Sequence, residues 1–151
     1  MSNASTARDP NFEARVRASF VKQKLMRTIG AVLEMVTAGA VDIRLPFRED
    51  LTQQHGFLHA GTIAAVADSA CGYAALSLMP ADAGVLSIEF KVNMLAPAKG
   101  EAIVARGEVI RAGRTIMVCR ADVYSMIGAE EKLVAAMQGT MMVVTGRELN
   151  D

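Results

Sequence analysis

Residues 59–79 read HAGTIAAVADSACGYAALSLM, the longest apolar stretch of the chain, and Pro80 follows them. The stretch is long enough to cross a membrane, which takes about 20 apolar residues. However, Asp68 lies near its middle, where a charge costs roughly 2.5–3.5 kcal/mol on insertion scales. The stretch is also rich in Ala and Gly rather than Leu and Ile. We therefore expect a long helix, stopped by Pro80, inside a soluble domain.

Segments on both sides of this stretch have the pattern of strands. Apolar and polar residues alternate over 41–48 and 85–94, as in half-buried strands. Asp9-Pro10 predicts the start of a short amphipathic helix that ends near Arg27. Further strands are expected over about 29–36, 101–111, 115–127 and 132–145, with turns at 38–39, 111–114 and 128–130.

These elements together predict an α+β fold. The short connections imply antiparallel pairing of the strands, and a helix that is apolar all round must be enclosed. We expect a curved antiparallel sheet of about five or six strands, wrapped around one long central helix, plus a short N-terminal helix. The small residues of the long helix would let the strands come close to it.

Length and composition narrow the classes of function. The 151 residues predict a single domain over 1–151, with about the first eight residues flexible. Lys and Arg together number 16, and Asp and Glu together also number 16, so the formal net charge is zero. This balance argues against nucleic-acid binding. Cys71 and Cys119 make no disulfide framework, and no secretory signal is readable, so we expect a cytoplasmic protein. Its expected partners are small molecules or copies of itself.

Asp68 and the start of the long helix are the candidate functional features. The residues three and four positions from Asp68 are small and apolar, so its carboxylate is either functional or paired with a strand N–H or an Arg. Beyond His59, the first N–H groups of the helix suit an anion or a developing oxyanion. The alternative is that Gly56 and Gly61 only permit a tight turn. His55 and His59 have the spacing of a zinc helix but lack its glutamate, so no metal is expected.

Residues 53–70, QQHGFLHAGTIAAVADSA, resemble the signature of hotdog-fold acyl-CoA thioesterases of the PaaI (phenylacetate-pathway) type. That signature has an amide residue, then G-x-x-H-G-G, then an acidic residue nine positions after the His. The similarity continues from about residue 25 over most of the chain, including 86–90, 96–100 and 113–115. It is fairly specific for the family and says little about the acyl group.

The resemblance implies a hydrolase that converts a thioester to a free acid and coenzyme A. By it, Asp68 is the nucleophile or the general base that activates water. The Ala60 N–H, next to Gly61, polarises the thioester carbonyl. Gln53 and His59 position this carbonyl or the motif loop, and Ser87 is a candidate to hold the water. No separate cofactor is implied, because coenzyme A is part of the substrate.

The chain departs from the family pattern at three positions. Ala60 replaces the usual first glycine, but its N–H remains. Gln53 stands where many members have Asn. Gly72 occupies a position where some relatives carry Ser or Thr, so that no hydroxyl is supplied from there.

Helix geometry adds an expectation about assembly. Ala60 and Asp68 are eight residues apart, which is about 12 Å along a helix, so they cannot both contact one carbonyl. If both act, we expect a homodimer with two equivalent sites at its interface, and a dimer of dimers (homotetramer) beyond it. Arg111, Arg114 and Lys99 are expected to bind the coenzyme A phosphates. The alternative is that they are solvated turn charges.

Two other functions stay open. One is an acyl-CoA hydratase or dehydratase on the same fold, which would want a His–Asp or His–Glu proton-transfer pair; the expected D-x-N-P-x-H run is absent from the sequence. The other is an acyl-CoA-binding or regulatory protein without turnover.

Overall fold

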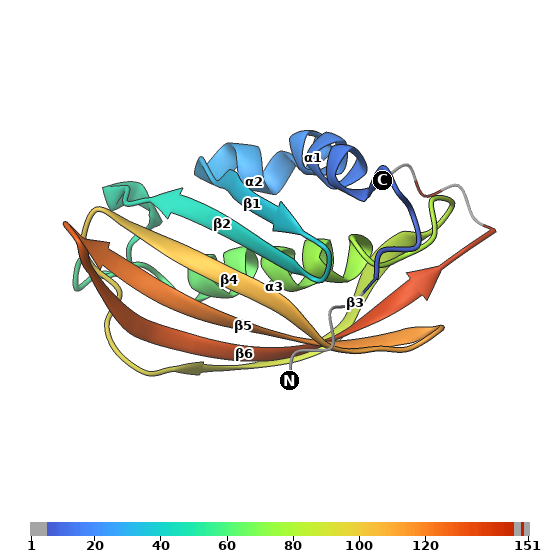
Figure 1. Ribbon diagram of the computed structural model, residues 1–151. Helices are drawn as coiled ribbons and strands as arrows, with labels where there is room; N and C mark the ends of the chain where they lie inside the picture. The colour runs from blue at the N-terminus through green and yellow to red at the C-terminus, as the bar shows by residue number, and fades with distance from the viewer. Residues whose placement is uncertain (1–5, 147–148, 150–151) are drawn as a thin grey trace.

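Six antiparallel strands form one curved sheet, and the long helix α3 lies along one face of it (Figure 1). The computed structural model describes residues 6–146 and 149. The elements in chain order are α1 (Phe12–Lys22), α2 (Lys24–Ile29), β1 (Val32–Thr37), β2 (Ala40–Pro46), a short 3-10 turn (Glu49–Leu51), α3 (Ala60–Leu76), β3 (Gly84–Met94), β4 (Ala102–Ala112), β5 (Ile116–Ile127) and β6 (Glu130–Val144).

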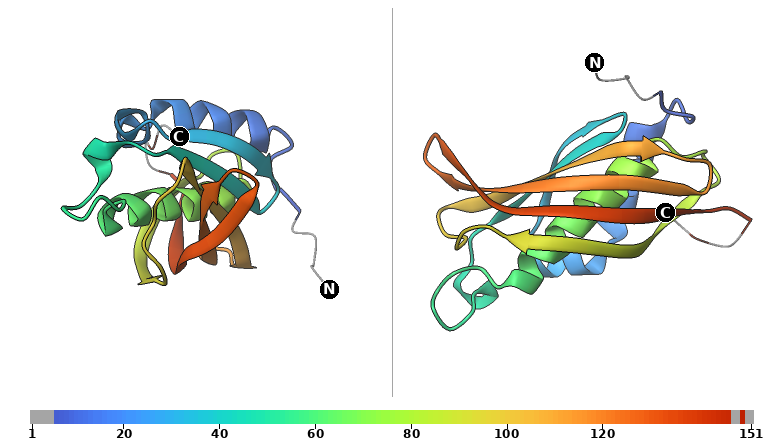
Figure 2. Two further views of the ribbon diagram at one scale, coloured as in Figure 1. Left: turned by 90° about the vertical axis from the view of Figure 1, so that its left-hand side faces the viewer. Right: turned by 90° about the horizontal axis from the view of Figure 1, so that it is seen from below.

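The strand order in the sheet is β1-β2-β4-β5-β6-β3, so β1 and β3 are the two edges. Helix α3 separates β2 from β3 in sequence and contacts all strands from β2 to β6. Seen from below, it crosses behind the strands (Figure 2). The predicted α+β fold, a sheet wrapped around one long helix, is confirmed. No helix in the described part of the chain is long and apolar enough to cross a membrane.

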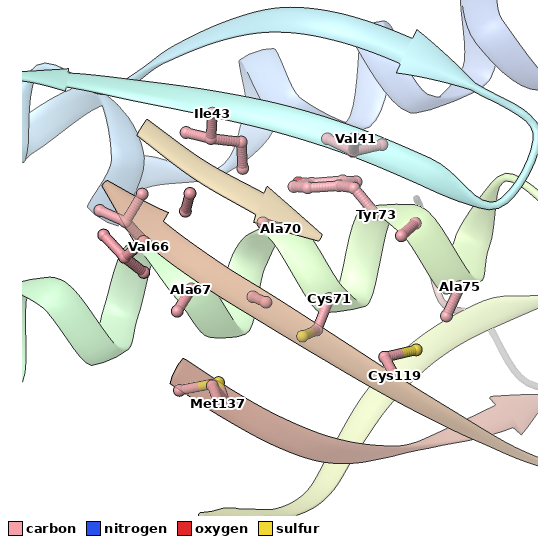
Figure 3. Close-up of a cluster of buried hydrophobic side chains, with 14 of the residues drawn as sticks. Val41, Ile43, Val66, Ala67, Ala70, Cys71, Tyr73, Ala75, Cys119 and Met137 are labelled. Atoms are coloured by element: carbon pink, nitrogen blue, oxygen red, sulfur yellow. The ribbon is translucent and has the colours of Figure 1, made fainter. Parts of the chain in front are cut away.

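Small residues allow α3 to lie close to the sheet. A Cβ placed on Gly107 of β4 would overlap the backbone of Ala70 on α3, so only glycine fits there. Around this contact, apolar side chains from α3, β2, β5 and β6 form the core (Figure 3). Cys71 and Cys119 are free and fully buried in it. Burial raises the pKa of the Cys119 thiol to about 12 and that of Cys71 still further, so both thiols remain protonated.

The N-terminal segment differs from the single helix that its sequence predicts. The chain leaves the helical conformation at Gln23, whose φ and ψ are −73° and 102°, and a second helix, α2, follows. Gly30 ends α2 in the left-handed region with a φ of 84°, which glycine adopts readily. The next strand therefore begins at Val32, and the prediction that it starts near residue 29 was wrong.

Two predicted helix ends also shift. Asp9 is not the N-cap of α1: its Oδ1 accepts a hydrogen bond from the Asn11 N–H at 2.8 Å, and the helix begins at Phe12. Helix α3 ends at Leu76 rather than 79, because the chain continues in tight turns up to Pro80. Most of the flexible start expected over about the first eight residues falls on 1–5, which lie outside the described residues.

Arg15 connects α1 to the C-terminal end of α3. Its guanidinium donates hydrogen bonds to the carbonyl oxygens of Leu76 at 2.8 Å and Met79 at 3.0 Å. A cation at this end complements the helix dipole and satisfies carbonyl groups that have no partner inside the helix. Arg15 thereby holds the N-terminal helices against α3.

We predict that Arg15→Met lowers the free energy of unfolding by about 2 kcal/mol, because buried carbonyl groups lose charged donors. Urea denaturation followed by circular dichroism measures the change. Arg17→Met is the matched control: Arg17 lies on the same helix in an exposed ion pair with Glu13, and its loss should cost less than about 0.5 kcal/mol. Equal losses in the two variants would contradict the role of Arg15.

Candidate active site

Asp68 projects from the middle of α3 with a single hydrogen-bond partner among the described residues. Its Oδ1 accepts a hydrogen bond of 2.7 Å from the Ser87 hydroxyl on β3. No ion pair joins it to a cation of the described chain. Its half-buried position raises the pKa of the carboxyl above its ordinary value, and the hydrogen bond from Ser87 opposes this rise. Among the described residues, the partner of Asp68 is thus a side-chain hydroxyl of β3, neither a strand N–H nor an Arg.

A small cavity of about 120 Å³ opens beside this carboxylate. The walls come from three places: α3, the start of β3, and α1 together with the break that follows it. Gln23, at that break, turns its carboxamide toward α3, and its Oε1 accepts a hydrogen bond of 3.1 Å from the Ser69 hydroxyl. The lining residues are Ser19, Gln23, Asp68, Ser69, Gly72, Tyr73, Val85 and Ser87.

His59 caps the N-terminus of α3 with its own ring. The ring Nδ1 accepts a hydrogen bond of 2.8 Å from the Gly61 N–H, which places the proton of the neutral ring on Nε2. A Cβ on Gly61 would lie only 3.1 Å from that Nδ1, so a larger residue would press on the cap. The Gly61 N–H is thus already occupied. The neighbouring Ala60 is an exposed residue, and its N–H has no acceptor within the described residues.

Gln53 lies on the loop that precedes α3. Its Oε1 accepts a hydrogen bond of 2.5 Å from the His55 N–H, and its backbone pairs with Phe57 and Gly56. With Ala60, it lines a second and more apolar cavity of about 370 Å³ between this loop and residues 94–98. Gln53 and Ala60 therefore line the same hollow, whereas His59, the N-cap of α3, is not among the residues that line it.

The chain holds the predicted site residues in two separate groups. Asp68 and Ser87 line the first cavity, and Gln53 and Ala60 line the second. Asp68 follows Ala60 by eight positions along α3, which corresponds to about 12 Å along the helix axis. Within one chain the two groups cannot contact the same small chemical group.

The basic residues predicted to bind phosphates also lie apart. Arg111 belongs to the end of β4 and Arg114 to the turn after it, whereas Lys99 lies just before the start of β4. The full length of β4, about 35 Å, therefore separates Lys99 from the two arginines. None of the three has an ion-pair partner in the described chain.

Sequence reasoning missed Gln23 as a wall of the Asp68 cavity. Phe12, Val16 and Phe20 keep helical spacing up to this point, and nothing local marks the break. The only signal is a lone polar amide where the apolar pattern stops, and it becomes informative once Ser69 is known to face it.

Comparisons with known proteins find both sequence relatives and similar solved structures. Residues 55–131 match the family model described as the Thioesterase superfamily. The crystal structure of a thioesterase family protein from Silicibacter pomeroyi is 47% identical, with a TM-score of 0.88, and the match covers 89% of this chain and 99% of that one. A 1,4-dihydroxy-2-naphthoyl-CoA hydrolase from Listeria monocytogenes is 27% identical over 82% of this chain and 98% of its own length. The E. coli PaaI protein from the phenylacetic acid degradation operon has a TM-score of 0.82 and covers 93% of this chain and 98% of its own, but at 16% identity this likeness concerns the fold alone.

The raised pKa of Asp68 predicts that its ionised form destabilises the folded chain. We expect Asp68→Asn to raise the melting temperature at pH values above the folded pKa, where the carboxylate is ionised. The gain should shrink as the pH falls through the folded pKa and vanish below the unfolded value near 3.8. Differential scanning calorimetry across this range measures it, with the exposed Asp82→Asn as control. A pH-independent difference would contradict the prediction.

Proposed function

The chain belongs to the thioesterase superfamily, and we propose that it hydrolyses the thioester of an acyl-CoA to a free carboxylic acid and coenzyme A. The observation that carries this proposal is a half-buried carboxylate with no cationic partner in the described chain, facing a cavity on a helix whose first N–H is free. A relative that is named as a CoA-thioester hydrolase supports the acyl-CoA class. The finer PaaI type rests on the motif over residues 53–70.

The proposed chemistry assigns a separate task to each half-site. The Ala60 N–H, at the positive end of the α3 dipole, binds the thioester carbonyl oxygen and stabilises the negative charge that develops on it. Asp68 attacks the carbonyl carbon or removes a proton from a water molecule that attacks it. If Asp68 removes the proton from water, the resulting hydroxide attacks, the C–S bond breaks, and Asp68 passes its proton to the leaving thiolate. If Asp68 attacks directly, the C–S bond breaks as an acyl–Asp68 anhydride forms, and a water molecule then hydrolyses this anhydride, its proton going to the thiolate. Both routes give the free carboxylic acid and coenzyme A. Ser87 holds the Asp68 carboxylate in place, and Gln53 and His59 shape the carbonyl side.

We further propose that the two half-sites meet across a homodimer. The edge strand β3 has exposed side chains along most of its length, among them Leu86, Ile88 and Phe90, which are 50%, 50% and 44% exposed. A free apolar edge of this kind favours pairing with another strand. A two-fold axis beside β3 would extend the sheet and set two α3 helices antiparallel, so that Asp68 of each chain approaches Ala60 of the other.

The same dimer would bring basic residues of two chains together to bind the coenzyme A phosphates. Arg111 and Arg114 lie at the Asp68 end of the sheet and Lys99 at the Ala60 end. The two-fold axis would bring these opposite ends of two chains toward each other. We therefore propose that the phosphates are bound by Lys99 of one chain and the two arginines of the other. A further pairing of dimers into a homotetramer and a cytoplasmic location complete the proposal.

Free-thiol release from a panel of acyl-CoAs tests the activity. We expect Asp68→Asn to lower kcat by about 10²–10⁴-fold, the range for loss of a general base. Asp82→Asn, an exposed aspartate in the turn after α3, should keep the wild-type rate. Because Cys71 and Cys119 are buried, a thiol reagent reports coenzyme A rather than the protein.

Each other outcome of this assay points away from the proposal. Equal rates for wild type and Asp68→Asn would refute the mechanism. Tight acyl-CoA binding without thiol release would favour a binding or regulatory protein. Loss of an enoyl double bond without thiol release would favour a hydratase.

Mixed dimers test the shared site. Ala60→Pro removes the free N–H at the first position of α3. Proline is tolerated at this position of a helix. The preceding residue, His59, has an extended backbone with ψ of 139°, which is the conformation that a following proline requires. Alone, Ala60→Pro and Asp68→Asn should each be inactive. A purified heterodimer of the two has one intact site of two, so we expect about half of the wild-type activity. Heterodimers without activity would show that Ala60 and Asp68 do not act across the interface; Gln53→Ala in place of Ala60→Pro controls for distortion of the helix start.

A further inference from the structure

Gly72 occupies a helix position where glycine is unfavourable and packing does not require it. It lies within α3, where alanine would be more stable than glycine. Its φ is not positive, and a Cβ placed on it would meet no atom within 4 Å. Gly107 differs, because a Cβ there would overlap the backbone of Ala70. Neither backbone conformation nor steric contact accounts for a glycine at position 72.

The open space over Gly72 belongs to the cavity beside Asp68. Both residues line this cavity, and residues four apart lie on the same face of a helix. Gly72 is one turn, about 6 Å, closer to the C-terminus of α3 than Asp68. The missing side chain therefore leaves the cavity open directly beyond the carboxylate.

The other walls of the cavity are anchored. The Gln23 carboxamide is bound by the Ser69 hydroxyl at 3.1 Å. Tyr73 is buried and packs edge-on against Phe20, with ring centroids 5.7 Å apart. Because these groups are held by their own contacts, the cavity cannot widen without breaking them. The depth of the cavity is therefore set by the size of the side chain at position 72.

We propose that Gly72 determines the size of the acyl group that the site accepts. This inference rests on the proposed function: the thioester carbonyl lies at Asp68, and the acyl chain extends into the cavity over Gly72. An acetyl group ends at the carboxylate, whereas longer or aromatic acyl groups use the space that a side chain at position 72 would fill.

Gly72→Ala and Gly72→Leu test the proposal with acetyl-, butyryl-, hexanoyl- and benzoyl-CoA. We expect kcat/KM for acetyl-CoA to be lowered least in both variants, because the acetyl group ends at the carboxylate. For hexanoyl- and benzoyl-CoA it should fall about 10-fold in Gly72→Ala and about 100-fold in Gly72→Leu, as steric exclusion of methylene groups from a pocket predicts. Gly72→Ala should also raise the melting temperature by about 2–4 °C, which shows that the fold is intact.

Ala14→Leu is the control, because it adds bulk at an exposed position of α1 that does not line this cavity; it should leave the acyl profile unchanged. An unchanged profile in both Gly72 variants, or an equal loss for every acyl-CoA, would overturn the inference while leaving the proposed function intact. A wild-type protein that releases no thiol from any acyl-CoA would overturn the proposed function and this inference with it.

Discussion

The close contact between α3 and the sheet is the constraint on which the rest of the structure depends. Gly107 on β4 lies against the backbone of Ala70, and α3 turns a row of fully buried small residues toward the strands. Larger residues would hold the helix away, and the strands could not curve around it while keeping the interior filled. The small residues on the side of α3 that faces the sheet, mainly alanines, are therefore a requirement of the packing. It leaves little room for polar groups anywhere that the sheet covers.

This constraint decides where chemistry can occur on the helix. Polar groups lie at the exposed N-terminus, where His59 forms its cap, on the side that faces the edge strand β3, where Asp68 meets Ser87, and on the side that faces the N-terminal helices, where Ser69 meets Gln23. Burying a carboxylate without a hydrogen-bond partner costs free energy of folding. For Asp68 this cost is reduced by the hydrogen bond from the Ser87 hydroxyl and by the partial exposure of the carboxylate to water. One helix thus carries an oxyanion-type donor and an acid at separate points along its axis.

Much of this arrangement follows from sequence patterns. Strand periodicity predicted a sheet of five or six strands, and the apolar run predicted α3, because both signals are local and repeated along the chain. The break at Gln23 could not be predicted, since it is linked to Ser69, a residue 46 positions away. Likewise, spacing singled out Asp68 but not its partner. Ser87 meets it only because β3 forms the edge beside α3, with a register shift directly after that serine.

The hydrogen bond between Asp68 and Ser87 joins the chemistry of the acid to the free edge of the sheet. Ser87 belongs to β3, the strand with exposed apolar side chains along its length. Burial is already the largest influence on the pKa of Asp68. A protein surface that covers β3 would remove more water from the carboxylate and raise this pKa further. The placement of the acid beside an uncovered edge therefore makes its proton affinity depend on what that edge is paired with, so association and acid–base behaviour are coupled through one serine.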